Sequence, residues 1–470
     1  MPSSRPSRRH VLIGAAASAA TAGLLPFGRP QVAQASGFAP LEARKGTVQL
    51  APAEFPKTEV WGYDGLAPGP VLRHPQGGRL QRQLINRLPQ PTSVHWHGIR
   101  IDNAMDGVPG LTQEAVPPGG QFDYDFALPD AGTYWYHAHW ASPEQVGRGL
   151  HGALVVTEAD APDVDRDEVL LLDDWRLNPE DGQIFADFDN MHDRSHAGRL
   201  GNISTCNGLY DAVIPVKQNE RLRLRLINAA NARIFTLALQ GMSGWVMALD
   251  GMPLPEPIVA SEALVLAPGQ RIDLIVDVTA SEEALVLRQA VNGEAWVQVA
   301  FPVRGQAASQ PRKAPAPLPP NPNMATAPLA EARPLDLHMQ GGAMGGMASA
   351  SYQGETLGMR DLARKGQFWA FNGISGRTDH PLARATLGEA LQIQLRNDTA
   401  FAHAMHLHGM HFREVLEGGT YGPMRDTLLL GRGETRSIAF VADNPGKWLF
   451  HCHMLGHAAS GMTSWIEVTA

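Results

Sequence analysis

The residues of this chain that could do chemistry gather in four short clusters of histidine. The clusters read His95-Trp96-His97, His137-Ala138-His139, His403-Ala404-Met405-His406-Leu407-His408 and His451-Cys452-His453, with His457 and Met462 shortly after the last. One His-x-His pair alone is a weak sign, because two histidines often only decorate the polar face of a strand. Several such pairs beside a thiol and a thioether are the ligand set of copper rather than of magnesium or calcium. The pattern therefore predicts that the chain binds several copper ions.

The segment His451-Cys452-His453 is predicted to touch two metal sites at once. On a β-strand, residues two apart point to the same side and the residue between them points away. Both imidazoles would then face one site and the thiolate the other. Such a segment joins the two sites covalently and offers a path for electrons between them.

The Cys452 side is predicted to hold one blue copper. His457 lies five residues after Cys452 and Met462 lies ten residues after it, so the turn that follows the strand can wrap one ion. His403 completes a His2Cys set with a distant axial methionine, which is the arrangement of blue electron-transfer copper. An ordinary core methionine is the alternative for Met462.

Eight histidines remain, which is enough for three further coppers. They are His95, His97, His137, His139, His406, His408, His451 and His453. Four come from the start of the chain and four from its end, so we expect their site at an interface between the first and last domains. Three coppers together could reduce O2 by four electrons to two waters. The other candidates lack partners at ligand spacing and are expected at the surface or in supporting roles: His74, His151, His192, His196, His338, His380 and His411.

This twelve-ligand pattern resembles that of the multicopper oxidases, the laccase-like family that includes bacterial cuprous oxidases. The resemblance covers the chain after its first 35 residues and implies an all-β fold of three consecutive cupredoxin-like Greek-key β-sandwich domains. It also implies four Cu ions, one of type 1, one of type 2 and two of type 3. The implied ligands are His403, Cys452, His457 and Met462 for type 1, His95 and His406 for type 2, and His97, His137, His453 and His139, His408, His451 for the two type 3 ions.

Composition agrees with sandwiches, because 48 glycines and 36 prolines separate short runs rich in valine, isoleucine, leucine and threonine. The predicted parts are a signal peptide at 1–35, domains at 36–160, 161–304 and 335–470, and a Pro/Ala-rich linker at 305–334. In the middle domain, arginines alternate with apolar residues from Arg221 to Asn228. That alternation predicts a strand with one buried and one wet face. The middle domain has no His-x-His pair.

The first 35 residues read as a twin-arginine signal for export to the periplasm. Arg8-Arg9 precede an apolar stretch at 11–25, and Ala33-Gln34-Ala35 resembles a cleavage site. Removing them leaves 35 basic and 47 acidic residues, a net charge of −12, which argues against nucleic acid and anionic lipid as partners. No later stretch is long and apolar enough to span a bilayer, so stable membrane insertion is not expected.

Proton supply and the electron donor are less fully specified. Reduction of O2 needs protons, and Asp106, eleven residues after His95, is the predicted acid, with a turn aspartate as the alternative. The family often has a second acid where this chain has Ala458. A methionine-rich segment could bind Cu(I) or could be only a flexible loop; it contains Met339, Met344, Met347 and Met359. Thr399 and Phe401 stand where a cuprous oxidase would offer Asp and Met.

The leading hypothesis is an oxidase that takes electrons from a phenol, an aromatic amine or a metal ion such as Cu(I) and passes them to O2. Asp106, His451, Cys452 and His453 would carry the chemistry. A copper nitrite reductase is one alternative, but it needs only one histidine copper. A non-enzymatic exported scaffold of the same fold is another, but it would lack ligands that are all present here.

Overall fold

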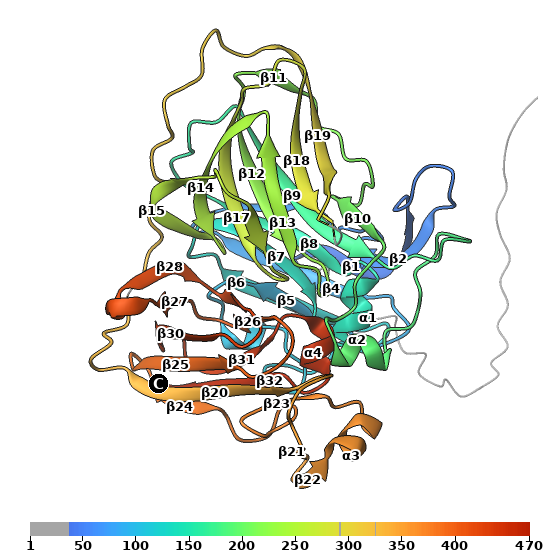
Figure 1. The fold of residues 1–470 in the computed structure, drawn as a ribbon, viewed down its shortest axis with the longest axis vertical. Helices are drawn as coiled ribbons and strands as arrows, with labels where there is room; N and C mark the ends of the chain where they lie inside the picture. The colour runs from blue at the N-terminus through green and yellow to red at the C-terminus, as the bar shows by residue number, and fades with distance from the viewer. Residues whose placement is uncertain (1–36, 291–292, 325) are drawn as a thin grey trace, which may run out of the picture. The chain divides into compact units, whose positions relative to one another are not determined.

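Strands make up most of the regular structure (Figure 1). The computed structural model describes residues 37–470 except 291, 292 and 325, so the predicted signal peptide lies outside the described residues. The strands fall into three consecutive groups, each built on two large sheets, which we call the first, middle and third sandwich. None of the helices among the described residues is long and apolar enough to cross a membrane.

The first sandwich has two four-stranded sheets with orders β2-β1-β4-β6 and β3-β8-β7-β5. Its strands are β1 (Ala39–Val48), β2 (Thr58–Tyr63), β3 (Leu72–Pro75), β4 (Arg79–Asn86), β5 (Val94–His97), β6 (Gln121–Ala127), β7 (Gly132–Ala138) and β8 (His151–Thr157). A 3-10 turn at Asn103–Met105 and α1 (Ser142–Gly147) interrupt them. Strand β5 pairs with β7 so that His95 lies opposite His137. Two of the four histidine clusters are therefore neighbours in one sheet.

The middle sandwich has a six-stranded sheet, β10-β9-β12-β17-β14-β15, and a five-stranded sheet, β11-β19-β18-β13-β16. Its elements are β9 (Arg166–Trp175), α2 (Met191–Ser195), β10 (Ile203–Cys206), β11 (Val216–Gln218), β12 (Arg221–Asn228), β13 (Phe235–Gln240), β14 (Met242–Leu249), β15 (Met252–Val259), β16 (Leu264–Leu266), β17 (Arg271–Val278), β18 (Glu283–Gln289) and β19 (Ala295–Gln306). Leucines from both sheets, such as Leu224 of β12 and Leu237 of β13, pack in a core of their own.

The third sandwich has sheets of six and five strands, β23-β20-β25-β30-β27-β28 and β24-β32-β31-β26-β29, and a small hairpin of β21 and β22. Its elements are β20 (Arg333–Gly341), β21 (Ser349–Tyr352), β22 (Glu355–Gly358), α3 (Met359–Arg364), β23 (Trp369–Phe371), β24 (Ala383–Thr386), β25 (Ala390–Asn397), β26 (His403–Leu407), β27 (Phe412–Val415), a 3-10 turn (Glu417–Gly419), β28 (Tyr421–Arg425), β29 (Thr427–Leu430), β30 (Thr435–Val441), β31 (Gly446–Cys452), α4 (Leu455–Ala459) and β32 (Thr463–Thr469). Strand β26 pairs with β31, and His406 lies opposite His451.

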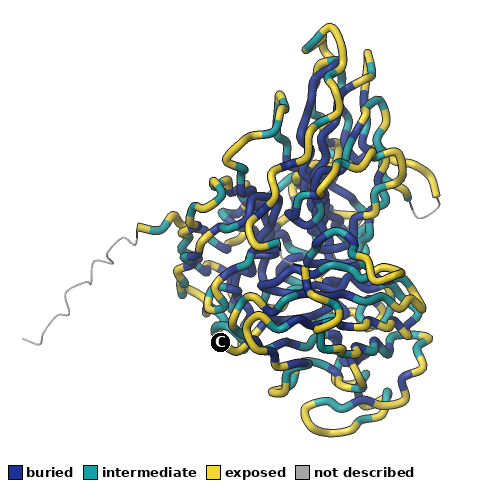
Figure 2. Tube along the Cα trace, turned by 90° about the vertical axis from the view of Figure 1, so that its left-hand side faces the viewer, coloured by how far each residue is buried: buried dark blue, intermediate teal, exposed yellow. Residues whose placement is uncertain are grey.

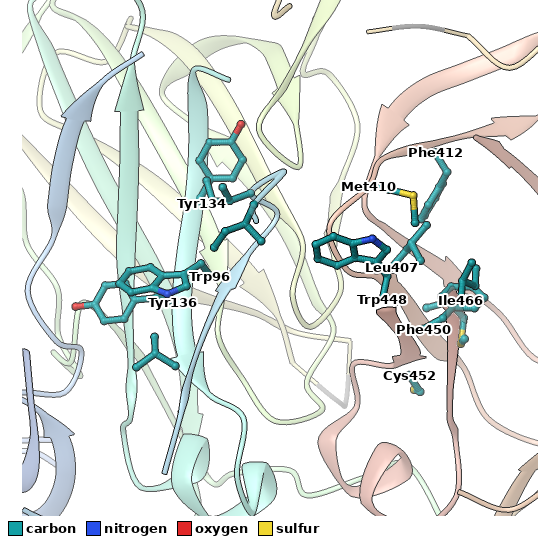
Figure 3. Close-up of a cluster of buried hydrophobic side chains, with 14 of the residues drawn as sticks. Trp96, Tyr134, Tyr136, Leu407, Met410, Phe412, Trp448, Phe450, Cys452 and Ile466 are labelled. Atoms are coloured by element: carbon teal, nitrogen blue, oxygen red, sulfur yellow. The ribbon is translucent and has the colours of Figure 1, made fainter. Parts of the chain in front are cut away.

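Buried residues run through the interior of all three sandwiches (Figure 2). In β31 the side chains of Trp448, Phe450 and Cys452 belong to the apolar core of the third sandwich (Figure 3). Because side chains alternate along a strand, His451 points to the opposite side. The apolar face of β31 thus positions the thiol, and its other face positions the imidazole.

Strand β12 departs from the sequence-based prediction of one wet face. Arg221, Arg223 and Arg225 are all buried, each no more than 2% exposed, so that prediction was wrong. Each guanidinium is compensated by a carboxylate, as buried charges must be. The pairs are Arg221 with Asp277 at 2.7 Å, Arg223 with Asp273 at 2.6 Å and Glu158 at 2.9 Å, and Arg225 with Asp167 at 2.7 Å. Arg225 also donates to Thr133 Oγ1 of the first sandwich at 2.8 Å. The polar face of β12 is therefore an interface.

The Pro/Ala-rich segment between β19 and β20 is attached to the first sandwich. Asn321 accepts a hydrogen bond from Ala131 N at 2.8 Å and returns one to Ala131 O at 2.8 Å. Leu318 is buried against Met247 and Ile275 of the middle sandwich. The segment has no strand among its described residues, yet it is fixed by these contacts.

Candidate copper centre

A first cluster of ligands forms around Cys452 at the end of β31. Its Sγ lies 3.6 Å from His403 Nδ1 and 3.8 Å from His457 Nδ1, and these two nitrogens are 3.1 Å apart. All three residues are buried. A triangle of this size suits one transition-metal ion with bonds of roughly 2.0–2.3 Å. The structure thus brings together the three predicted strong ligands of the blue copper.

The outer nitrogens of both histidines in this cluster are held by hydrogen bonds. His403 Nε2 lies 2.8 Å from Thr399 Oγ1, and His457 Nε2 lies 2.7 Å from the carbonyl oxygen of His196. Donation from Nε2 leaves the Nδ1 lone pairs facing the thiol. Thr399, where a cuprous oxidase was expected to offer Asp, therefore orients a predicted copper ligand.

Met462 lies on the turn that closes this cluster. Its backbone oxygen accepts from Cys452 N at 3.1 Å, and its N–H donates to His457 O at 3.0 Å. The residue is fully buried in the core of the third sandwich. These contacts place Met462 beside both residues.

A segment of the middle sandwich covers the outer side of this cluster. Three consecutive carbonyls at 194–196 accept hydrogen bonds from Trp369 Nε1 at 2.6 Å, Ala343 N at 2.7 Å and His457 Nε2 at 2.7 Å. The Trp369 ring also packs against the His457 ring, with centroids 4.4 Å apart. Residues 194–196 thus connect the middle sandwich to His457 and Trp369.

The eight remaining predicted ligands form a second cluster between the first and third sandwiches. Two pairs of rings stack, each with one histidine from either sandwich: His95 on His408 at 3.8 Å, and His97 on His406 at 3.7 Å. Three sets of histidines have ligand atoms within 4.8 Å of one another. They are His139, His408 and His451; His95, His406 and His408; and His95, His97 and His137. The centroid of His453 is 4.9 Å from that of His97 and 5.3 Å from that of His137.

The nitrogens of this cluster divide into an outer and an inner set. The Nδ1 atoms of His95 and His406 donate to the carbonyl oxygens of Asp106 and Asp426, at 2.9 and 3.0 Å. Several buried inner nitrogens have no hydrogen-bond partner among the described residues, namely His95 Nε2, His97 Nδ1, His137 Nε2, His406 Nε2 and both nitrogens of His453. Buried polar atoms are rarely left unpaired. A neutral imidazole has one nitrogen with a free lone pair, and metal ions would accept one such lone pair from each of these rings, so the residues present fit copper.

Two buried carboxylates support the stacked pairs, one for each pair. Asp106 lies with its carboxylate 3.0 Å from His408 Nδ1 and 3.3 Å from His95 Nδ1. The carboxylate of Asp426 lies 3.2 Å from His97 Nε2 and 3.4 Å from His406 Nδ1. Asp106 was expected from its spacing after His95. Asp426 was missed, because only the pairing of β26 with β29, which sets His406 opposite Thr427, brings it near.

Burial sets the protonation of the free ligands. It lowers the pKa of His451 to about 3 and that of His457 to about 4, and it raises the pKa of the Cys452 thiol to about 12. At neutral pH the imidazoles are therefore neutral and ready to donate lone pairs. The thiol carries a proton that an incoming ion must displace.

These shifts predict that the copper-free protein loses stability in mild acid. The folded pKa values of His451, His457 and His411, about 3, 4 and 4, lie below the ordinary value of 6.5. The unfolded chain therefore binds more protons below pH 6.5, so stability falls as pH drops from 6.5 toward 4. Each histidine should cost about 1.4 kcal/mol per pH unit in this window. Urea-unfolding midpoints at pH 7, 6 and 5 measure the effect, and a constant midpoint would contradict it.

The methionine-rich segment is used mainly for packing. Met339 and Met347 are buried, and Met359 packs against a small cluster around Leu362. Met344 is 81% exposed. Two of the four thioethers are thus buried and a third is partly buried, so this segment is packed rather than a flexible loop.

Ala458 lines a pocket that is also lined by two histidines of the second cluster. The pocket has a volume of about 360 Å³, and His139, His451 and Arg377 are among its lining residues. No carboxylate lines it among the described residues. The family's second acid, absent at Ala458, is therefore not replaced by another acid among the residues that line this pocket.

Comparison with known proteins assigns the family. Profiles described as multicopper oxidase match residues 45–161, 167–297 and 351–470. The solved multi-copper oxidase of Pseudomonas thermotolerans is 34% identical, with a TM-score of 0.79, over 92% of this chain and 98% of that one. The chain belongs to the multicopper oxidase family. This confirms the resemblance stated from the ligand pattern.

Two further relatives are similar over most of their length. The structure of Lac15 from a marine microbial metagenome is 40% identical, with a TM-score of 0.75, over 92% of this oxidase and all of that chain. Multicopper oxidase MmcO of Mycobacterium tuberculosis is 29% identical over 440 residues, which are 86% of this chain and 82% of that protein. The oxidase is thus a copper-dependent oxidoreductase. Its predicted fold of three cupredoxin-like β-sandwiches is confirmed.

Proposed function

We propose that this oxidase holds four copper ions and couples one-electron oxidation of a small donor to the four-electron reduction of O2 to water. The observation that carries the proposal is the set of unpaired inner nitrogens between the first and third sandwiches. His403, Cys452, His457 and Met462 would hold the type 1 ion. His95 and His406 would hold type 2, with His97, His137, His453 and His139, His408, His451 on the type 3 pair. Copper would supply the one-electron steps and the site of O2 reduction.

The chain's own part in electron transfer is the link between the clusters. The sulfur of Cys452 lies in the first cluster, and the rings of its neighbours His451 and His453 lie in the second. The three residues are consecutive in the chain, with β31 ending at Cys452, so the path runs through covalent bonds. The same link supports an oxidase over a protein with two unconnected copper sites.

We expect Asp106→Asn to lower oxygen consumption by about 10- to 100-fold, the usual effect of losing a partner of metal ligands. Asparagine keeps the size of the side chain but removes the charge and the proton-carrying group beside His408 and His95. Blue absorption should be unchanged, because Asp106 does not contact the cluster around Cys452. Oxygen uptake and visible absorption of the same sample measure both effects.

Asp102→Asn is the matched control, since Asp102 lies four residues earlier, is exposed, and forms no side-chain cap. It should leave oxygen uptake unchanged. If Asp106→Asn also consumed oxygen at the original rate, the proton role of Asp106 would be wrong.

The donor is proposed to be a phenol, an aromatic amine or Cu(I), oxidised on the outer side of residues 194–196. His196 supports this route, because its carbonyl is hydrogen-bonded to His457. Met344 has an exposed thioether and follows Ala343, whose N–H donates a hydrogen bond to the carbonyl of Ser195. This thioether lies next to a residue that contacts segment 194–196, so Cu(I) is kept among the proposed donors.

Oxygen uptake with Cu(I) and with a methoxyphenol, beside a copper count per chain, tests the proposal. Four coppers and uptake with either donor would support it. Uptake mainly with Cu(I) would indicate a role in copper tolerance. A protein that binds no copper and consumes no oxygen would overturn it.

We also propose that the oxidase acts in the periplasm after export by its twin-arginine signal at 1–35. Fractionation of cells that produce the full chain, compared with an Arg8→Lys, Arg9→Lys variant, tests this. Export of the variant at the original level would contradict it.

A further inference from the structure

The middle sandwich, which offers no His-x-His pair, reaches the histidine cluster through Arg271 at the start of β17. The guanidinium is fully buried and grips Asp426 at two points, with Nη1 at 2.9 Å from Oδ1 and Nη2 at 2.6 Å from Oδ2. Its remaining donors bind backbone carbonyls of Thr133 at 3.1 Å, Gly269 at 2.9 Å and Asp250 at 3.0 Å. Arg271 is therefore held rigidly by all three sandwiches.

The same carboxylate of Asp426 also faces two predicted copper ligands. Its Oδ1 lies 3.2 Å from His97 Nε2 and 3.4 Å from His406 Nδ1, and it accepts from Thr427 Oγ1 at 2.7 Å. Donation from His97 Nε2 leaves His97 Nδ1 as the free nitrogen that turns inward. The orientation and tautomer of His97 thus depend on where Asp426 is fixed.

The two residues before Arg271 contact the cluster or a residue beside it. A Cβ at Gly269 would lie 3.0 Å from the rings of both His453 and His97, and Gly269 has a φ of +84°, which favours glycine. Gln270 donates from Nε2 to Thr427 O at 3.0 Å. The segment 269–271 is therefore fitted against the histidines.

We propose that Arg271 is a positioning residue of the trinuclear copper site, acting through Asp426 on His97 and His406. This inference rests on the proposed function. A bidentate arginine fixes both position and rotation of a carboxylate, which a single point charge does not. Partners of metal ligands of this kind set the ring orientation and usually change metal affinity 10- to 100-fold when they are removed.

Arg271→Met tests the inference against Arg223→Met as the matched control. Arg223 is an equally buried arginine of the middle sandwich with two carboxylate partners, Glu158 and Asp273. Both variants should unfold at lower temperature, because each leaves buried carboxylates uncompensated. Only Arg271→Met should lose trinuclear copper, with a 10- to 100-fold lower affinity in chelator titrations and a weakened type 2 electron paramagnetic resonance signal. Blue absorption should persist in both.

Arg271→Lys keeps the positive charge but cannot form the bidentate contact with Asp426. It tests the inference if Arg271→Met does not fold. We expect it to show an intermediate loss of trinuclear copper. If the variant that folds binds trinuclear copper as tightly as the unchanged protein, the inference is wrong. Arg271 would then be a purely structural residue. If the unchanged protein itself bound no copper, the proposed function would fail instead.

Discussion

Replacing Cys452 with serine is expected to abolish the blue absorption and to lower oxygen consumption by far more than the 10- to 100-fold cost of losing a supporting residue. The sulfur lies 3.6 Å from His403 Nδ1 and 3.8 Å from His457 Nδ1, and as a thiolate it would give the first cluster its soft anionic ligand. A hydroxyl is a poor substitute, because copper in such sites prefers thiolate. The same change removes the sulfur end of the path to His451 and His453. Visible absorption, oxygen uptake and copper content of one preparation measure all three consequences.

Cys206→Ser is the control for this substitution. Cys206 is also free and fully buried, and burial raises its pKa to about 12 as it does that of Cys452. Cys206 packs in the core of the middle sandwich, away from both clusters. Its serine variant should keep the blue absorption and the activity at the cost of some stability. Retention of blue absorption in Cys452→Ser would refute the assignment of the type 1 site.

The predicted ligands could be read from the sequence because strand alternation is local. The opposite facing of Cys452 and its two neighbouring histidines follows from the period of a strand, and the structure places Sγ in one cluster and the imidazoles in the other. Asp106 could be suggested because it follows His95 by only eleven residues.

Asp426 and Arg271 could not be found in this way, because their roles come from contacts across sheets and sandwiches. Arg271 is 155 residues from Asp426, and nothing in its neighbourhood signals metal chemistry. The arginines of β12 were misread because an alternating pattern does not say whether the polar face meets water or carboxylates on the neighbouring strands β9 and β17. Composition could not show either that Met339 and Met347 of the methionine-rich segment are buried.

Removing copper is expected to lower the unfolding temperature by on the order of 10 °C or more. Ions in the second cluster would bind nitrogens from β5 and β7 of the first sandwich and from β26 and β31 of the third, so they cross-link the two. Ligands that bind only the folded state stabilise it by mass action, and several tight sites add together. Without them, buried nitrogens such as His137 Nε2 and His406 Nε2 have no partner among the described residues.

The measurement is a pair of thermal unfolding scans, before and after chelation, followed by a third after copper is returned. Recovery of the original temperature on reloading would separate the loss of ions from damage to the chain. Cys452→Ser provides an internal comparison, because it should lose the type 1 ion and keep the cross-linking cluster. We therefore expect chelation to lower the unfolding temperature of Cys452→Ser by most of the amount seen in the unchanged protein. Equal unfolding temperatures with and without copper would show that the interface between the first and third sandwiches is stable without the ions.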